Sequence, residues 1–90
     1  MTIKKLLISN RGEIASRIIK SAHDMGITCV AIYTEADKNT PYVREADQSF
    51  KLSDSYLNAK EILEIAKKNN VDAIHPGYGF LSENETFSQM

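Results

Sequence analysis

A nearly continuous apolar run, rich in β-branched side chains, decides the fold: Ile27-Thr28-Cys29-Val30-Ala31-Ile32-Tyr33-Thr34. A strand with one solvated face alternates polar and apolar residues, whereas a strand of a parallel sheet is covered on both faces and does not alternate. This run therefore predicts a buried strand of a parallel sheet, and it places Cys29 in the core as a small apolar residue.

A strand and a helix are predicted upstream of this run. Lys4–Ser9 holds a short apolar core and predicts a first strand. From Glu13 to Gly26, apolar residues recur at helical spacing, and Gly26 is a typical helix stop. The expected core-facing stripe consists of Ile14, Ile18, Ala22 and Met25, widened by Ala15 and Ile19.

Downstream, the same alternation of strands and helices continues. We expect a short helix near Tyr42–Ala46, a third strand at Ser49–Leu52, a helix capped by Asn58 and Glu61, and a fourth strand at Val71–His75. A second capping box, Ser82 to Glu85, opens a last helix of barely two turns before Met90. Such alternation predicts an α/β fold with a Rossmann-like parallel sheet over residues 1–90, and the short last helix predicts an incomplete domain.

Composition excludes several classes of protein. Ninety residues with 42% hydrophobic and 26% charged residues are ordinary for one small globular domain. The formal net charge of -1 and the scattered lysines and arginines argue against a nucleic-acid partner. No apolar run approaches the roughly 20 residues that cross a membrane, so we expect no membrane partner. With one cysteine and no targeting pattern, the expected location is the cytoplasm.

Two loops fall where ligands bind in parallel sheets, at the carboxyl ends of strands. The first follows the first strand and contains Asn10, Arg11 and Gly12. The second begins at His75 and runs to Asn84. In it Gly77 and Gly79 flank Tyr78, which can present the ring to a pocket, although packing within the loop explains the pattern equally well. His75 is expected to be structural, and His23 receives no function.

The first loop does not match the fingerprint of a dinucleotide-binding site. The fingerprint G-x-G-x-x-G keeps side chains away from a pyrophosphate, but this loop has the single glycine Gly12, followed by Glu13. We therefore expect Gly12 to serve helix–strand packing and Glu13 to favour the helix dipole. Glu35 and Asp37 after the second strand imitate the ribose-binding acid, which is a weak signal by itself. Neither a catalytic set nor a metal-ligand spacing emerges, so the chain alone is expected to catalyse nothing and bind no cofactor.

Taken in order, several motifs resemble the N-terminal domain of biotin carboxylases. They are Lys5–Ala15 with Arg17–Ile19 behind it, Ala36-Asp37, Val43–Asp47, Ser55–Asn58 and, as the most specific, His75–Asn84. The resemblance spans about Lys4 to Phe87. Other ATP-grasp ligases share the fold and a looser form of the last motif, but not the start at Asn10.

The resemblance implies a Rossmann-like domain placed before an ATP-grasp domain. The family's enzymes are ligases that use ATP and Mg²⁺ to activate bicarbonate as carboxyphosphate and then carboxylate carrier-bound biotin. Their nucleotide, metal and bicarbonate ligands lie beyond these residues. Here the resemblance implies a wall of the biotin pocket, made by Gly77, Tyr78, Gly79, Glu83 and Asn84.

The resemblance also implies partners: a biotin carboxyl carrier protein, a carboxyltransferase and a second copy in a homodimer. Arg17, Lys20 and Asp24 on the first helix would form the dimer surface, or else a merely solvated face. The family has a longer Gly- and Pro-rich loop where Gln48–Asp54 forms a short polar bridge, which leaves the subfamily and the final acceptor open, whether acetyl-CoA for fatty acid biosynthesis, propionyl-CoA or pyruvate. Two alternatives remain, a stand-alone Rossmann-type nucleotide-binding module and a non-catalytic interaction domain.

Overall fold

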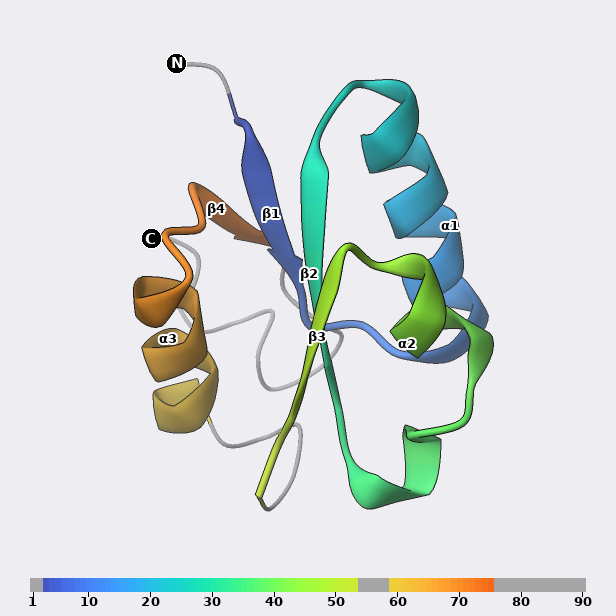
Figure 1. The fold of residues 1–90 in the computed structure, drawn as a ribbon, viewed down its shortest axis with the longest axis vertical. Coiled ribbons are helices and arrows are strands. Elements are labelled where there is room, and N and C mark those ends of the chain that lie inside the picture. The colour runs from blue at the N-terminus through green and yellow to red at the C-terminus, as the bar shows by residue number, and fades with distance from the viewer. Residues whose placement is uncertain (1–2, 54–58, 76–90) are drawn as a thin grey trace.

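The computed structural model describes residues 3–53 and 59–75 as one α/β unit. The elements follow one another as β1 (Lys5–Ile8), α1 (Gly12–Asp24), β2 (Thr28–Tyr33), the 3₁₀ turn η1 (Glu35–Asp37), α2 (Pro41–Glu45), β3 (Gln48–Lys51), α3 (Ala59–Lys68) and β4 (Ala73–His75) (Figure 1). The predicted strands and helices in this part of the chain are confirmed, and η1 is an addition. The last predicted helix lies outside the described residues.

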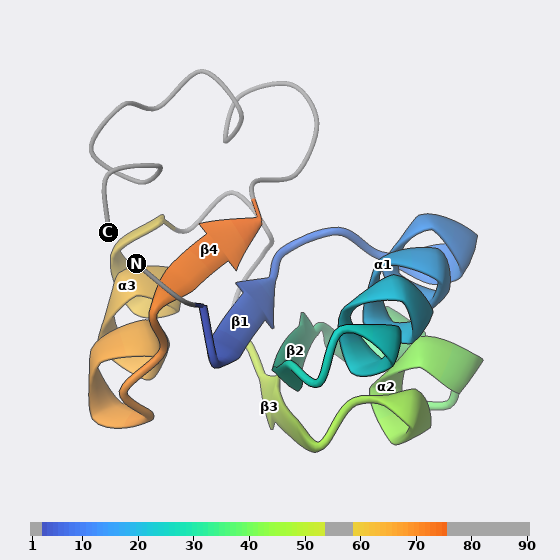
Figure 2. The same ribbon diagram turned by 90° about the horizontal axis from the view of Figure 1, so that it is seen from above.

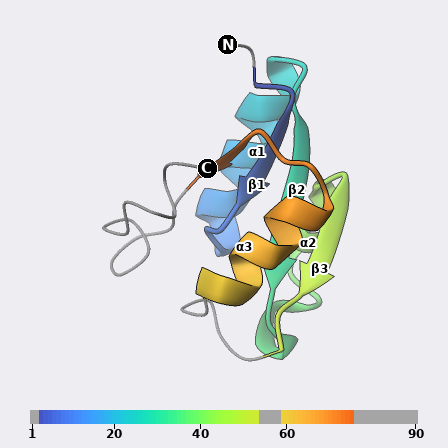
Figure 3. The ribbon, with the colours of Figure 1, turned by 90° about the vertical axis from the view of Figure 1, so that its left-hand side faces the viewer.

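All strand pairs are parallel, and the sheet order is β3-β2-β1-β4. This is the strand order 3-2-1-4 with which a Rossmann-like sheet begins. Figure 2 shows α1 and α2 on one face of the sheet and α3 on the other. Seen from the side of α3, that helix crosses in front of the strands (Figure 3). The predicted Rossmann-like parallel sheet is confirmed.

Two apolar clusters form the core, one on each face. Alternate residues of β1 divide between them: Leu7 packs with Ile62 and Ala66 of α3, whereas Ile8 packs with Ala15 and other residues of α1 and α2. Because β2 contributes to both clusters, its four central residues from Cys29 to Ile32 are fully buried. This two-sided burial is why the run that decides the fold does not alternate.

The apolar face of α1 is rotated relative to the prediction. The buried residues are Ala15, Ile19 and Ala22, while Ile14 is 40% and Met25 is 75% exposed. Residues spaced by four and three lie on one face of a helix, so the stripe centred on Ala15, Ile19 and Ala22 excludes Ile14. Met25 follows the last helical residue and caps the helix instead of covering the sheet. Ile14 and Met25 were therefore wrongly assigned to the core.

Gly12 and Gly26 mark the two ends of α1 with left-handed backbone angles, φ of 64° and 76°. The prediction that Gly12 serves close packing is wrong, because a Cβ added there would meet nothing within 4 Å. Glycine is suited to this position by its backbone angle, which costs other residues strain. Gly26 acts as the predicted helix stop.

The segment after α2, a short polar bridge by its sequence, forms a strand and buries an apolar residue. Gln48–Lys51 forms the edge strand β3, and Leu52 behind it is 2% exposed. The backbone N–H and the hydroxyl of Ser53 both donate to the carboxylate of Glu61, which ties the end of β3 to the first turn of α3. Asn58, the predicted cap of α3, lies outside the described residues. In the described part of the chain, no helix has the length and apolarity that crossing a membrane requires.

Candidate functional site at the carboxyl edge of the sheet

The carboxyl ends of β1 and β4 lie side by side, with Ile8 paired to His75 (Figure 2). Beyond that pair, Ser9 donates twice to the carbonyl oxygen of His75, from its backbone N–H at 3.2 Å and from its hydroxyl at 2.8 Å. Ser9 is buried, so water competes little for these bonds. The two loops that the sequence singles out therefore leave the sheet from adjacent points.

A side-chain hydrogen bond joins the same two loops. The Nδ1 of His75 lies 2.9 Å from Oδ1 of Asn10, whose residue is only 6% exposed. An amide oxygen only accepts, so His75 donates the Nδ1 proton in this pair. Asn10 thus holds the His75 ring at the start of the second loop, in agreement with the structural role expected for this histidine.

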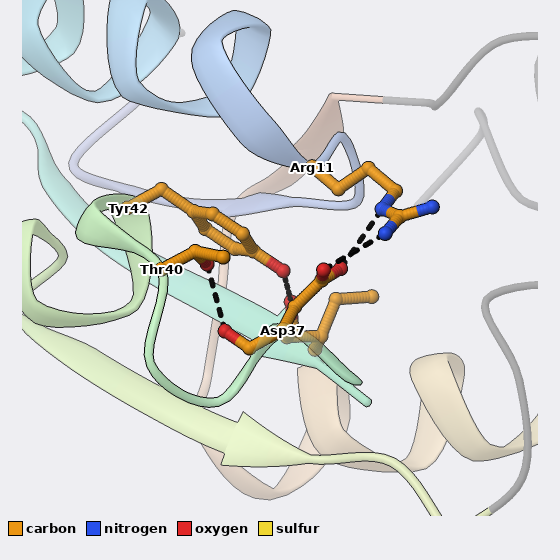
Figure 4. Close-up of polar contacts among 5 residues, drawn as sticks. Arg11, Asp37, Thr40 and Tyr42 are labelled. Carbon is orange, nitrogen blue, oxygen red and sulfur yellow. Dashed lines mark hydrogen bonds and ion pairs between the residues drawn. The ribbon is translucent and has the colours of Figure 1, made fainter. Parts of the chain in front are cut away.

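Arg11 and Asp37 form a two-pronged ion pair at this edge (Figure 4). The Nε and one terminal nitrogen of Arg11 donate to the two carboxylate oxygens of Asp37, each at 2.8 Å. The side chain of Asp37 is 8% exposed and that of Arg11 is 61% exposed. Such a two-pronged contact fixes direction as well as distance, so it ties the loop after β1 to the turn after β2.

Two hydrogen bonds from side-chain hydroxyls to backbone oxygens stabilise the segment after β2. The hydroxyl of Thr40 donates to the backbone oxygen of Asp37 at 2.7 Å, and the buried hydroxyl of Tyr42 donates to the backbone oxygen of Ile32 at 3.0 Å (Figure 4). These bonds place Asp37 under the Arg11 guanidinium. Asp37, which in the sequence imitated a ribose-binding acid, is therefore held in an ion pair with Arg11.

Glu35, the second acid of that pattern, is also paired. It forms ion pairs with Lys38 and Lys51. Hydrogen bonds from these two ammonium groups lower the pKa of Glu35 to about 2. With both acids paired and one glycine in the loop, the dinucleotide alternative loses the observation that favoured it.

The remaining predicted pocket residues, Gly77, Tyr78, Gly79, Glu83 and Asn84, lie outside the described residues. Their assignment to a biotin pocket stays a prediction. What the structure describes is the point from which their loop starts, because His75 is fixed to Ser9 and Asn10 immediately before it.

The outer side of α1 carries the predicted dimer residues. Arg17, Lys20 and Asp24 are all exposed there. Of these three residues, Arg17 lines a shallow, largely apolar groove of about 340 Å³, together with Leu6, Ile18 and Met25 among others. Sequence reasoning missed this groove because it assigned Met25, which is 75% exposed, to the buried face. The dimer surface itself stays a prediction.

A cluster at the opposite, amino edge was also missed. One oxygen of Asp47 accepts the backbone N–H of Cys29 at 2.7 Å and lies 2.8 Å from Nε2 of His23. The N–H of Cys29 and then the His23 ring hold the pKa of Asp47 below its usual range. Burial, and next the Asp47 carboxylate, raise the pKa of the Cys29 thiol to about 11. Nothing in the sequence signals this cluster, because its members come from three separate segments: α1, β2 and the bend before β3.

The strand order, the alternation of strands and helices and the two loops that meet at the carboxyl edge define a Rossmann-like α/β domain. The family model for the biotin carboxylase N-terminal domain matches residues 2–90, so the chain belongs to that family. The resemblance noted in the sequence is confirmed.

Curated relatives support this assignment. The chain is 53% identical to biotin carboxylase 1 of Bacillus subtilis, over 98% of this chain and 21% of the relative. It is 52% identical to pyruvate carboxylase of Staphylococcus aureus, over 97% of this chain and 8% of the relative. The chain thus spans about a fifth or less of these two enzymes.

A solved structure shows the same fold. The biotin carboxylase domain dimer of Hydrogenobacter thermophilus 2-oxoglutarate carboxylase, in complex with MgADP, ADP and bicarbonate, superimposes with a TM-score of 0.89 at 43% identity. The match covers 99% of this chain and 20% of that chain.

Proposed function

We propose that this chain is the N-terminal domain of an ATP-dependent biotin carboxylase. In the proposed reaction, bicarbonate attacks the terminal phosphate of Mg-ATP to give carboxyphosphate and ADP. The carboxyl group then passes to biotin on its carrier protein and phosphate is released. The observation that carries the proposal is the family match over residues 2–90. The neighbouring carboxylase domain with bound MgADP and bicarbonate supports the choice of substrates.

The proposed task of this domain is to form one wall of the biotin pocket. The loop containing Tyr78 begins directly after His75, whose carbonyl and ring are both held by the neighbouring loop. A strand end fixed in this way gives the following loop a defined starting point. An aromatic side chain between two glycines then supplies an apolar face for a flat ureido ring.

The groups that bind ATP, Mg²⁺ and bicarbonate are proposed to lie in the parts of the enzyme beyond this chain. The described residues contain no set of side chains arranged for phosphoryl transfer, and the chain corresponds to 21% of its Bacillus subtilis relative. This domain would then orient biotin, while other domains activate bicarbonate.

The proposed partners are a biotin carboxyl carrier protein, a carboxyltransferase and a second copy of the enzyme in the cytoplasm. The exposed Arg17, Lys20 and Asp24 form the proposed homodimer surface. A structural neighbour that is described as a dimer supports the homodimer. The proposal covers any final acceptor, because relatives of this domain belong to different carboxylases.

The test is a substitution of Tyr78 in the full-length enzyme. We expect Tyr78→Ala to raise the KM for free biotin roughly tenfold, the cost of about 1.4 kcal/mol of lost ring contact, while the KM for ATP stays within about twofold. Tyr78→Phe, which keeps the ring, is the matched control and should behave like the parent. An unchanged biotin KM in Tyr78→Ala would remove this loop from the pocket.

The rival nucleotide-module hypothesis has its own test. Calorimetric titration of the 90-residue chain with NAD should give no saturable heat, since Asp37 and Glu35 are engaged in ion pairs. Saturable binding, lost in a Glu35→Gln variant, would favour a dinucleotide-binding module over the carboxylase domain.

A further inference from the structure

Three side chains with different donor atoms meet at the amino edge of the sheet. His23 comes from the last turn of α1, Cys29 from the start of β2, and Asp47 from the residue before β3. One ligand atom of each, an imidazole nitrogen, a sulfur and a carboxylate oxygen, lies within 4.8 Å of the other two. The cluster lies at the edge of the sheet opposite to the candidate functional site, which is at the carboxyl ends of the strands.

The donor set suits one class of ion. Imidazole, thiolate and carboxylate are the side chains that bind Zn²⁺, with bonds of roughly 2.0 to 2.3 Å. In a tetrahedral site with such bonds, neighbouring donor atoms lie roughly 3.3 to 3.7 Å apart. The contact of 2.8 Å between His23 and Asp47 would widen, and the longer separations of up to 4.8 Å would shorten. Side-chain rotations of His23 and Asp47 cover changes of this size.

One of the three residues is buried and fixed, and the other two are accessible to solvent. Cys29 is fully buried, and its strand position is set by pairing with β1. The side chains of His23 and Asp47 are 40% and 44% exposed, so an ion can enter from solvent and keep a water ligand. Among the described residues, the sulfur reaches only distant backbone oxygens, those of Ile27 at 3.9 Å and Ile19 at 4.0 Å. Loss of the thiol proton therefore breaks no strong hydrogen bond.

The carboxylate is already oriented. The Asp47 oxygen that faces His23 accepts the backbone N–H of Cys29 at 2.7 Å. Hydrogen bonds of this kind to a ligating carboxylate fix its direction and add to the affinity of metal sites. The backbone of one ligand thus positions the side chain of another.

We propose that His23, Cys29 and Asp47 form a binding site for a divalent transition-metal ion of the zinc class, with water as a fourth ligand. On binding, the Cys29 thiol transfers its proton to solvent and its sulfur forms the metal bond, and no electron is transferred. The ion would join α1, β2 and the start of β3, so its effect is on stability. Mg²⁺, which prefers oxygen ligands, is excluded by the sulfur and nitrogen donors.

The test is a Co²⁺ titration of the reduced, chelator-treated 90-residue chain. We expect one equivalent to bind with a near-ultraviolet thiolate-to-cobalt absorption band, Zn²⁺ to abolish the band by displacement, and Mg²⁺ to have no effect. Zn²⁺ should also raise the Tm. Absence of the band, or a Zn²⁺ affinity no tighter than that of Mg²⁺, would overturn the proposal.

Variants separate this site from adventitious binding. His23→Gln changes an exposed side chain and keeps a hydrogen-bond donor for Asp47, so it should fold and bind Zn²⁺ at least tenfold more weakly. Cys29→Ala should lose the cobalt band, and its circular dichroism reports whether the fold is kept. His75→Gln, at the other edge of the sheet, is the matched control and should bind like the parent. Equal weakening in His23→Gln and His75→Gln would reject the site. These outcomes do not depend on carboxylase activity.

Discussion

Arg11 and Asp37 face each other in a two-pronged ion pair in which the carboxylate is buried and the guanidinium is largely exposed. The pair joins the loop after β1 to η1, 26 residues further along the chain. Water can hydrate the arginine if the pair is broken, but it reaches the aspartate poorly. The two partners should therefore differ in what their removal costs.

Arg11→Met should destabilise the chain more than Asp37→Asn does. The first change leaves a buried carboxylate without its cation and should cost about 2 to 3 kcal/mol, whereas the second leaves a hydrated guanidinium and should cost about 1 kcal/mol. Urea unfolding of both variants measures the difference. Equal losses would mean that solvent reaches Asp37 in spite of its burial.

Tyr42→Phe should isolate the contribution of one buried hydroxyl. Tyr42 is fully buried and donates to the backbone oxygen of Ile32, so removing its hydroxyl leaves a buried acceptor short of a partner. We expect a loss of about 1 to 2 kcal/mol in the free energy of unfolding. Tyr33→Phe is the matched control, since Tyr33 is only half-buried and its hydroxyl donates no hydrogen bond to the described residues. A similar loss in both variants would attribute the effect to ring packing instead.

Ile62→Ala should remove a large part of the stability of the chain. Ile62 is fully buried between α3 and the sheet, and truncations of this kind cost about 2 to 5 kcal/mol. A small domain has about 5 to 15 kcal/mol in total. Ile65→Ala, on the half-buried flank of the same helix, should cost clearly less. Denaturant midpoints of the two variants, compared with the parent, test this order.

Asp72 should make stability depend on pH. Its carboxylate accepts the backbone N–H groups of Lys4 and Lys5, at 2.8 and 2.9 Å, and these bonds lower its pKa in the folded state. The stabilisation is therefore fully present above the unfolded pKa of about 3.9 and is lost as pH falls through the lower folded pKa. Asp72→Asn should lower the Tm at pH 7, and the difference should vanish in strong acid.

Thermal scans of Asp72→Asn and the parent between pH 7 and pH 2 provide the measurement. Asp24→Asn is the control, because Asp24 accepts no such bond in the part of the chain that the structure describes. A Tm difference that stays constant with pH would show that the bonds to Lys4 and Lys5 do not distinguish the charged carboxylate.

The stability cost of replacing Gly12 should depend on how readily the new residue adopts a left-handed backbone conformation. Since a Cβ at this position meets no atom within 4 Å, the cost of adding one comes from the φ of 64°. Gly12→Ala should cost about 1 kcal/mol, Gly12→Val more, and Gly12→Asn least. Asn70 already adopts a φ of 55° in this chain. An equal cost for all three would indicate crowding that the fold does not show.

Much of the architecture followed from local patterns. The continuous apolar run at Thr28–Tyr33 predicted a strand covered on both faces, and the alternation of elements predicted the parallel sheet. The outcome for α1 differed: both Ile14 and Ala15 fit an apolar stripe, and only docking on the sheet selected Ala15. Two apolar residues one position apart differ by about 100° around a helix, so periodicity alone defines the stripe poorly.

The sequence by itself determined the elements, their order and the family, because periodicity, glycine positions and motif order are properties of neighbouring residues. Tertiary structure alone decided the polar contacts that join distant segments: Arg11 with Asp37, Asn10 with His75, and His23 with Asp47. The physical reason is that these pairs are separated by 24 to 65 residues along the chain. Their geometry exists only once parallel strands bring the segments to a common edge.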